Sequence, residues 1–225
     1  MKNYLQPTAI IDSDHPDVVQ FAAATTAQCG KDPRSVAVAL YNAVRDTIRY
    51  DPYSPFFLPA HYRASETLRK KVGFCIPKSA LLCALARARG IPARIGFATV
   101  RNHLATRQLI AFLGSDRFVY HGYAELLLGG RWVKTTPVFN ADLCARFQVP
   151  PLDFDGEHDA VFQPFNAEAQ PFMEYLADYG TFADVPVDAI VAAWTEAYGA
   201  VRVTAWIDAY NAGGSCRDFA SEDVA

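Results

Sequence analysis

The stretch GFCIPKSALLCALARARGIPAR, residues 73–94, decides the fold. It places Cys75 directly before a proline-marked helix start, and the residues that follow are apolar nearly all round the helix. Such a helix has no polar face, so we expect it to be buried and central, with its N-terminus presented to a cleft. Gly90 is the glycine that commonly follows a helix end, and Pro92 prevents continuation. The stretch therefore predicts a buried helix from Cys75 to about Arg89.

A cysteine at the start of a buried helix has two interpretations. The unpaired backbone N–H groups and the positive end of the helix dipole favour a thiolate at Cys75, which lowers the pKa of the thiol and makes it a nucleophile. Alternatively, Cys75 is a core cysteine at a helix start, with a structural role that Cys83 could fill two turns further in. The position alone leaves both interpretations open, and the presence of a base for the thiol decides between them.

Hydrophobic periodicity predicts helices before this stretch and strands after it. The helices expected before it cover residues 14–28, 33–48 and 62–71. The strands expected after it cover residues 93–100, 118–128 and 131–138, with Gly129-Gly130 as a hairpin turn. Helical patterns return over residues 168–179 and 186–211. Helices, then strands, then helices indicate an α+β fold, because a parallel sheet would need alternating strands and helices.

The whole chain, residues 1–225, is expected to form a single domain. Its parts are a core over about 33–140, an irregular loop over 141–166, a helical C-terminal extension over 167–211 and a mobile tail over 212–225. Within the core, the loop over 102–116 is a candidate cover for a site. The extension is a lid, a dimer surface or a scaffold, and the sequence leaves these three open.

Composition argues against several classes of partner and cofactor. Lys and Arg number 21 against 24 Asp and Glu, a net charge of −3, so we expect no nucleic-acid and no membrane partner. The sequence has neither about 18 consecutive apolar residues nor a signal-peptide core, so we expect a cytoplasmic protein. Five widely spaced cysteines without a CxxC pair, and histidines without HxH or HExxH, argue against a disulfide framework, a zinc site and a metal hydrolase. No cofactor is expected.

Five histidines are available as a base for the Cys75 thiol. His121 differs from the others because it lies inside an expected strand, FVYHGYAELLL, where alternation places it on one face with Tyr123 and Glu125. A histidine among apolar strand neighbours is more often structural than catalytic. Together with the Cys75 helix and the strand that follows, the pattern favours the catalytic interpretation.

These motifs together resemble the transglutaminase-like superfamily over about residues 40–140. The shared features are a cysteine that opens an apolar helix, a GIPAR run at its end, a strand with HGYAE and a following strand with GGRWV. The resemblance implies a papain-like fold with a central catalytic helix packed on an antiparallel sheet. It also implies a Cys-His-Asp triad, with Cys75 as the nucleophile and His121 as the base. Gly122 and Tyr123 stand where the family usually has Ala and Trp.

The third member of the triad departs from the family pattern. After the tryptophan the family usually has an Asp directly before a Pro, whereas Thr136 occupies that place in WVKTTPVFN. A hydroxyl can accept a hydrogen bond from an imidazole but cannot stabilise an imidazolium as a carboxylate does. Asn140 is the first candidate for the orienting role, followed by Asp142 or an acid from the loop 153–159. The alternatives are an impaired site, and a turn-and-cap role for Asn140 and Asp142.

Three further motifs have structural interpretations. Arg94 in the GIPAR run is expected to pair with an acid such as Glu125, so both residues would support the fold and not act as catalysts. The aromatic segment YDPYSPFF, residues 50–57, is a candidate wall of an apolar substrate cleft, with simple packing as the alternative. The acidic segment PPLDFDGEHDA, residues 150–160, does not match a calcium loop and is expected to be solvated.

The sequence therefore predicts a thiol-dependent acyl-transfer enzyme. We expect hydrolysis of an amide or peptide-like bond, in a small-molecule or peptide-like substrate, through a Cys75 acyl-enzyme with His121 as general base and acid. Transfer to an amine and a Dieckmann-type cyclisation are alternatives within the family, because the same nucleophile serves all three reactions. A non-catalytic binding protein on the same fold is a further alternative, motivated by Thr136. The oligomeric state is not predicted.

Overall fold

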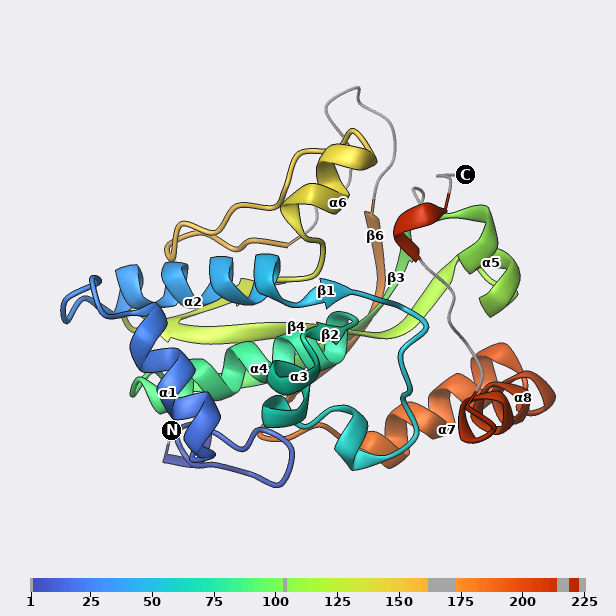
Figure 1. Ribbon diagram of the computed structural model, residues 1–225, viewed down its shortest axis with the longest axis horizontal. Coiled ribbons are helices and arrows are strands. Elements are labelled where there is room, and N and C mark those ends of the chain that lie inside the picture. The colour runs from blue at the N-terminus through green and yellow to red at the C-terminus, as the bar shows by residue number, and fades with distance from the viewer. Residues whose placement is uncertain (1, 103–104, 162–172, 214–218, 223–225) are drawn as a thin grey trace.

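The computed structural model describes residues 2–102, 105–161, 173–213 and 219–222 (Figure 1). His103 and Cys216 lie outside the described residues. The α-helices are α1 (Pro16–Thr25), α2 (Pro33–Thr47), α3 (Ala64–Lys70), α4 (Cys75–Ala88), α5 (Arg107–Leu113), α6 (Ala141–Arg146), α7 (Val187–Tyr198) and α8 (Ala200–Asn211). The strands are β1 (Arg49–Tyr50), β2 (Val72–Gly73), β3 (Ala93–Asn102), β4 (Arg117–Leu128), β5 (Arg131–Thr135) and β6 (Met173–Phe182). None of the described helices is long and apolar enough to cross a membrane.

The main sheet is antiparallel and has the strand order β5-β4-β3-β6. The β4–β5 hairpin turns at Gly129 and Gly130, both with positive φ, as the sequence predicts. β3 pairs with β4 through Arg94 opposite Glu125 and Gly96 opposite Tyr123. A separate two-stranded parallel sheet of β1 and β2 lies beside the start of α4. The expected α+β arrangement, with a helix on an antiparallel sheet, is confirmed.

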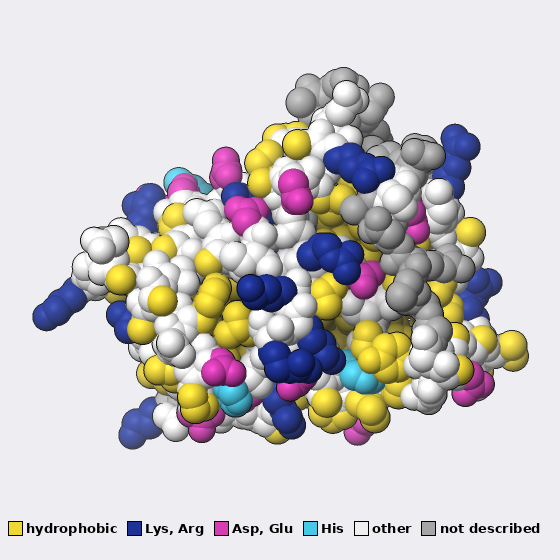
Figure 2. All heavy atoms as spheres, in the orientation of Figure 1, with side chains coloured by type: hydrophobic (Ala, Val, Ile, Leu, Met, Phe, Trp, Pro, Cys, Tyr) yellow, Lys and Arg dark blue, Asp and Glu magenta, His cyan; other side chains and the backbone are white. Residues whose placement is uncertain are grey.

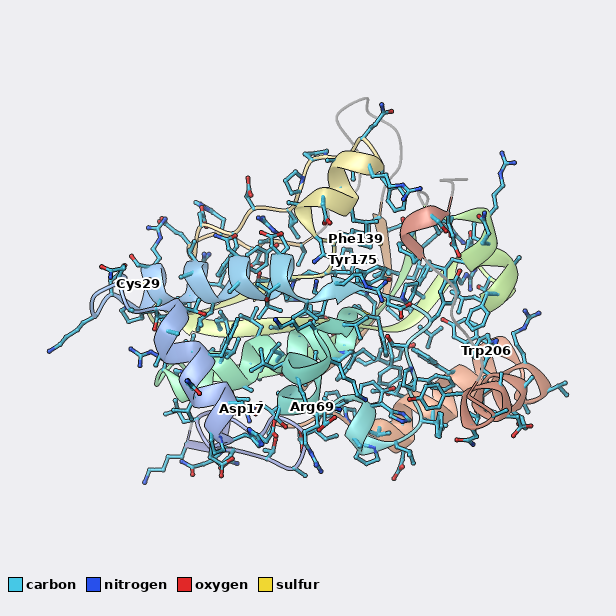
Figure 3. All side chains as sticks on the ribbon, viewed as in Figure 1. Asp17, Cys29, Arg69, Phe139, Tyr175 and Trp206 are labelled. Carbon is cyan, nitrogen blue, oxygen red and sulfur yellow. The ribbon has the colours of Figure 1, made fainter. Side chains whose placement is uncertain are left out.

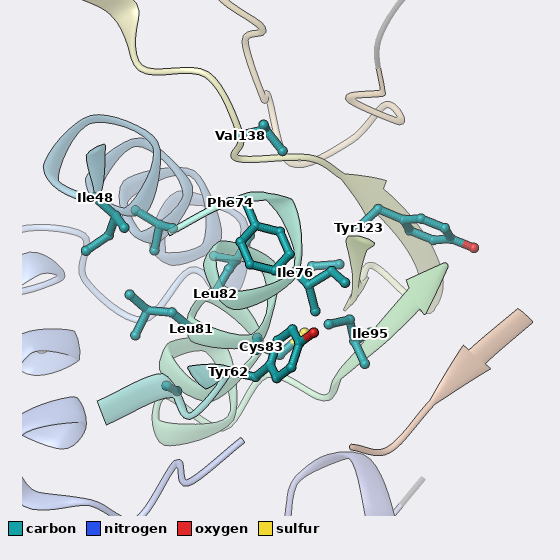
Figure 4. Packing of buried hydrophobic residues seen from close by; sticks show 14 of the residues in the cluster. Ile48, Tyr62, Phe74, Ile76, Leu81, Leu82, Cys83, Ile95, Tyr123 and Val138 are labelled. Atoms are coloured by element: carbon teal, nitrogen blue, oxygen red, sulfur yellow. The ribbon is translucent and has the colours of Figure 1, made fainter. Parts of the chain in front are cut away.

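α4 is the central helix of the fold, as its sequence predicts. Every residue from Ile76 to Arg87 is buried, and α4 packs on β4 on one side and on α1, α2 and α3 on others. Figure 4 shows Ile76, Leu81 and Leu82 of this helix enclosed by side chains of the core. Each such side chain stabilises the fold by roughly 1.5–3 kcal/mol through burial. The helix is therefore held rigidly, and its N-terminus has a fixed position.

The predicted helix over 168–179 is wrong, because Met173–Phe182 form the edge strand β6. β6 pairs antiparallel with the second edge of β3, from Asn102 opposite Met173 to Ile95 opposite Phe182. That edge presents a row of backbone groups that need partners, and a strand supplies them while a helix cannot. The C-terminal extension therefore begins, within the described residues, with a strand.

Other boundaries were also set by tertiary contacts. The predicted helical pattern over 186–211 is divided into α7 and α8 by Gly199, which has φ +90°. The loop expected over 102–116 contains α5, and the irregular region contains α6. The sequence predicts a mobile tail over 212–225, but Phe219 and Glu222 within it are buried.

Candidate active site

Cys75 is the first residue of α4 and is half-buried. The preceding residue, Phe74, has no side chain that caps the helix, so the N–H groups of the first turn remain available to other acceptors. The backbone N–H of Gly122 on β4 donates to the Cys75 Sγ at 3.5 Å. The thiol therefore lies where the N-terminus of the central helix meets the strand that contains His121.

Gly122 allows this close approach of helix and strand. A Cβ atom at this position would lie 3.0 Å from the Cα of Ile76 and 3.0 Å from its Cγ1. The first contact is with the backbone of α4, which cannot rotate away. A side chain at this position would therefore push helix and strand apart, and the glycine favours the approach of its N–H to the sulfur.

His121 follows directly after a bulge in β4. Ala98 of β3 lies opposite His121 and Val100 lies opposite Phe118, so two residues of β4 face the single residue Thr99. Within the bulge Tyr120 has φ +56°, a left-handed conformation that is costly for an aromatic residue. Bulges re-aim the side chain that follows them, and the histidine here is buried, with 7% of its surface exposed.

Helix α7 supports the bulge by hydrogen bonds to its backbone. The Tyr198 hydroxyl accepts from the Val119 N–H (2.9 Å) and donates to the Arg117 carbonyl (3.1 Å). The indole N–H of Trp194 donates to the Val119 carbonyl (2.8 Å). A bulge leaves its extra residue without ladder partners, and here side chains of α7 take their place.

Burial sets the protonation states of the thiol and the imidazole. It raises the pKa of Cys75 to about 11, and the nearby backbone N–H groups offset this only in part. Burial also lowers the pKa of His121 to about 4. The predicted depression of the thiol pKa is therefore wrong for the resting state, because desolvation outweighs the helix N-terminus. Both groups are neutral at pH 7.

Cys75 and His121 both line a cavity of about 100 Å³. We call this cavity the aromatic cavity. Its wall is formed by the segment after β1, by α5, by the start of β4 and by α7 and α8. It comprises Tyr50, 52–57, Phe74, Cys75, Leu109, Phe112, Leu113, 118–121, Trp194, Tyr198, Trp206, Ala209 and Tyr210. The prediction that the segment 50–57 forms a wall of an apolar cleft is confirmed.

The figures locate this region on the molecule. Figure 2 shows hydrophobic side chains gathered toward the right of the face, where Figure 1 has the segment after β1 and the helices α7 and α8. Figure 3 shows Trp206 where α8 meets the rest of the molecule. The C-terminal helices are thus part of the site and not an appendage to it.

Phe219 and Glu222, near the C-terminus, contact residues of the cavity wall without lining the aromatic cavity themselves. The ring of Phe219 packs against Tyr50 (5.3 Å between centroids) and Tyr53 (6.5 Å). The buried carboxylate of Glu222 accepts hydrogen bonds from the hydroxyls of Tyr53 (2.6 Å) and Thr106. These contacts fix the Tyr53 ring in the wall.

The named candidates for the third triad position, Asn140 and Asp142, and Thr136, which occupies the usual place of the Asp, lie elsewhere in the hydrogen-bond network. The Asn140 amide donates to the carbonyls of Arg45 and Ile48, and its Oδ1 accepts from the Tyr50 N–H (2.8 Å). Asp142 is exposed in the first turn of α6. The buried Thr136 Oγ1 has no hydrogen-bond partner among the described residues. Neither Asn140, Asp142 nor Thr136 is among the described residues that line the aromatic cavity.

Asn140 and Lys78 together cap the C-terminus of α2. The Lys78 ammonium, fully buried in α4, donates to the same Arg45 and Ile48 carbonyls as Asn140. The last carbonyls of a helix have no partners within it, so both side chains satisfy groups that would otherwise be orphaned. Burial lowers the pKa of Lys78 to about 7. Asn140 thus has a capping role, but at the end of α2: it is the N-cap residue of α6 and makes no side-chain cap bond to that helix.

The remaining motif residues support the sheet. Arg94 forms a 2.6 Å ion pair with Glu125, and its guanidinium stacks 4.1 Å from the ring centroid of Trp132. The expected Arg94–Glu125 pair is confirmed. Tyr123 points away from α4 (Figure 4), and its ring occupies the space that a side chain at position 96 would need. The family-like residues around His121 thus hold β3, β4 and β5 together.

Two results concern other possible sites. Among the described residues, no group of three His, Cys, Asp or Glu side chains could hold a metal ion. In the acidic loop, Asp155 accepts from the backbone N–H groups of Glu157 and His158, at 2.8 Å each, and pairs with the exposed His158 ring. The segment is also packed on the rest of the protein, because Phe154 and Ala160 are buried and Arg34 of α2 donates to the Asp155 carbonyl. The expectation of a solvated loop is therefore wrong for these residues.

Trp194, Tyr198 and Glu222 were not identifiable from the sequence. Their hydrogen-bond partners are 75 to 169 residues away, so no local spacing marks them. The only available signal was the aromatic content of the C-terminal helices, which is also typical of ordinary packing.

The chain was compared with protein-family models, curated proteins and solved structures. Residues 19–137, more than half of the chain, match the family model of the Transglutaminase-like superfamily. A solved structure of a proposed cysteine protease from Cytophaga hutchinsonii is similar at 18% identity and TM-score 0.43, with 80% of this chain and 53% of that chain covered. A proposed protease from Parabacteroides distasonis is similar at 15% identity and TM-score 0.39, with 56% and 25% covered. This chain thus spans about half the length of the first and a quarter of the second. Curated proteins give no match.

Proposed function

This chain belongs to the transglutaminase-like superfamily, and on that basis we propose that it is a thiol-dependent acyl-transfer enzyme that hydrolyses an amide or peptide-like bond. Cys75 is the nucleophile and His121 is the general base and acid. The observation that carries the proposal is the common location of these two side chains in the wall of one cavity, where the helix N-terminus meets β4. A nucleophile and a base brought together by separate elements are typical of covalent catalysis.

The neutral thiol and neutral imidazole favour proton transfer during the attack and not before it. His121 takes the proton of Cys75 as the sulfur bonds to the carbonyl carbon. The uncapped N–H groups at the start of α4 are available to stabilise the oxyanion that develops. The protonated His121 then gives its proton to the leaving amine as the C–N bond breaks, which leaves a thioester on Cys75. Water hydrolyses the thioester with His121 as base.

In this proposal Asn140 acts through the backbone and does not contact the imidazole. It holds the turn before Tyr50, whose ring lines the aromatic cavity, so it is a positioning residue. Asp142, at the start of α6, is assigned no chemical step. Transfer to an amine and an intramolecular cyclisation use the same first half-reaction, and they differ only in the acceptor that replaces water.

A non-catalytic binding protein is the second candidate. It is favoured by Thr136, whose buried hydroxyl stands where the family has a carboxylate, and by the neutral state of Cys75. An imidazolium formed during catalysis would lack the carboxylate that usually stabilises it. This candidate predicts ligand binding without a covalent intermediate on Cys75.

The experiment that separates the two uses p-nitrophenyl acetate. We expect a burst of p-nitrophenolate, with the acetyl group found on Cys75 by peptide mass spectrometry. The burst should be absent in Cys75→Ala and slower by about 10²-fold or more in His121→Asn, whereas Cys29→Ser serves as a matched control away from the site. Acetylation spread over several cysteines, or a burst unaffected by His121→Asn, would reject the enzyme.

A further inference from the structure

The wall of the aromatic cavity has an unusual chemical composition. Of its 21 residues, 12 are Phe, Tyr or Trp, and none is Lys, Arg, Asp or Glu. Moving a charged group from water into such surroundings is strongly unfavourable unless a partner of opposite charge is present. Within the described residues the wall offers no such partner, so a charged substrate group is disfavoured next to Cys75.

Several polar atoms of the wall are used by the protein itself. The Tyr53 hydroxyl donates to Glu222, and the Tyr198 hydroxyl is engaged by the backbone of the β4 bulge. The indole N–H of Trp194 donates to the Val119 carbonyl. A polar ligand group that enters the cavity would lose its water and find these three groups already engaged, which costs free energy. The cavity thus disfavours polar groups as well as charged ones.

The aromatic side chains form a preorganised and close-packed frame. Phe112 of α5 stacks on Trp206 of α8, with 4.5 Å between ring centroids and an interplanar angle of 18°. Phe56 packs on Trp194 at 4.7 Å. The volume of about 100 Å³ is similar to that of dry apolar cavities, on the order of 150 Å³, that bind benzene. The space fits one aromatic ring or a short branched alkyl chain.

We infer that the substrate of this enzyme carries an uncharged aromatic or branched aliphatic group on the acyl side of the reacting bond, and that this group binds in the aromatic cavity. The inference rests on the proposed function for the chemistry, but the binding preference rests on the cavity alone. The acyl part is assigned to the cavity because Cys75 is itself in the wall and keeps the acyl group after the leaving group departs. The Cys75 S–C bond forms, the C–N bond breaks, and the Cys75 proton reaches the leaving amine through His121.

The first test measures binding without chemistry. The Cys75→Ala variant is titrated with phenylacetamide, with its 4-carboxy and 4-aminomethyl derivatives and with acetamide, and tryptophan fluorescence is followed. Two of the three tryptophans, Trp194 and Trp206, line the cavity. We expect phenylacetamide to bind at least about tenfold more tightly than either charged derivative, a difference of about 1.4 kcal/mol, and acetamide to give no change.

A charge placed at the wall supplies a matched pair of variants. Ala209 of α8 is exposed and lines the cavity, whereas Ala205 on the same helix is exposed and does not line it. In Ala209→Asp the preference for phenylacetamide over the aminomethyl derivative should fall, because the cation gains a partner. In Ala205→Asp the preference should stay unchanged. Equal effects of the two substitutions would overturn the inference.

The second test uses turnover and separates this inference from the proposed function. The wild-type protein is given phenylacetyl and acetyl thioesters with the same leaving group, and we expect kcat/KM to be at least about tenfold higher for phenylacetyl. Equal turnover of both thioesters, or equal binding of charged and uncharged amides, would overturn the inferred substrate class and leave the proposed acyl-transfer activity in place. Selective binding of phenylacetamide without turnover of any thioester would contradict the proposed acyl-transfer activity and leave the inferred binding preference in place.

Discussion

The hydroxyl of Tyr198, on α7, accepts a hydrogen bond from the backbone N–H of Val119, in the β4 bulge two residues before His121. The same hydroxyl donates to the Arg117 carbonyl, so one side chain from the C-terminal region binds the backbone within the bulge and just before it. Because the bulge contains Tyr120 in a left-handed conformation, it needs support from outside the strand. Helix α7 thus has two roles: it supports the bulge that precedes His121, and it contributes side chains to the wall of the aromatic cavity.

Replacing Tyr198 by Phe should affect both stability and chemistry. The substitution removes the partner of the Val119 N–H, on a half-buried residue, and of the Arg117 carbonyl, on an exposed one, so we expect the free energy of unfolding to fall by about 0.5–1.5 kcal/mol. The rate of Cys75 acylation should fall while KM changes little, since the cavity keeps its ring. Urea denaturation and burst kinetics measure the two effects. Tyr210→Phe, at an exposed position of the cavity mouth, is the control, and an equal effect there would contradict the role of Tyr198.

Gly122→Ala should separate α4 from β4. The added Cβ would lie 3.0 Å from the Ile76 Cα, so the helix N-terminus has to shift. Overpacking of this kind costs about 1–3 kcal/mol, and the Gly122 N–H should no longer reach the Cys75 sulfur. We expect a lower urea midpoint together with slower acylation of Cys75. An unchanged midpoint would mean that the backbones adjust without cost.

Alkylation should report a protonated thiol in the resting protein. Because burial raises the pKa of Cys75 to about 11, its reaction with iodoacetamide should be slow near neutral pH and should rise steadily with pH. Peptide mass spectrometry over about pH 5 to 9 resolves each cysteine, and the half-buried Cys29 gives the comparison. Fast alkylation of Cys75 at about pH 6 that disappears in His121→Asn would instead demonstrate a preformed thiolate–imidazolium pair.

The protein should lose stability in acid because His121 is buried in its neutral form. Its pKa is about 4 in the folded protein and about 6.5 when unfolded, so the unfolded state binds more protons between these values. The free energy of unfolding should therefore fall as the pH is lowered from about 6.5 to about 4, by up to about 3 kcal/mol. His121→Asn should reduce this slope, and His15→Asn, at a half-exposed position, is the matched control. A pH dependence that is identical in both variants would contradict the prediction.

Asn140→Ala should destabilise the fold more than it affects the chemistry. It leaves two helix carbonyls with Lys78 as their remaining partner and the Tyr50 N–H without one, at a cost of about 1–3 kcal/mol. At a temperature where the variant is folded, the pH dependence of Cys75 acylation should match that of the wild type. A changed pH dependence would instead support the orienting role that the sequence suggests for Asn140.

The sequence was sufficient to predict those elements that are determined by residues close together in the chain. The apolar run after Cys75 has no polar face, so it predicts a buried helix whatever its neighbours are. Gly90 and Pro92 end that helix by their own backbone restrictions. Glycines with positive φ set the β4–β5 hairpin, and the register of that hairpin follows from the turn. The pairing of Arg94 with Glu125 follows from the two strands being neighbours in the chain and in space.

The sequence by itself thus determined the central helix, the strands that follow it and the place of Cys75 at the helix start. Only the tertiary structure decided that Met173–Phe182 pair with β3, that α7 supports the bulge before His121, and that Glu222 accepts a hydrogen bond from Tyr53 in the cavity wall. It also decided that burial keeps the Cys75 thiol neutral. The physical reason is the same in each case: unpaired backbone groups and desolvation depend on what packs against a residue, and those partners lie far away in the chain.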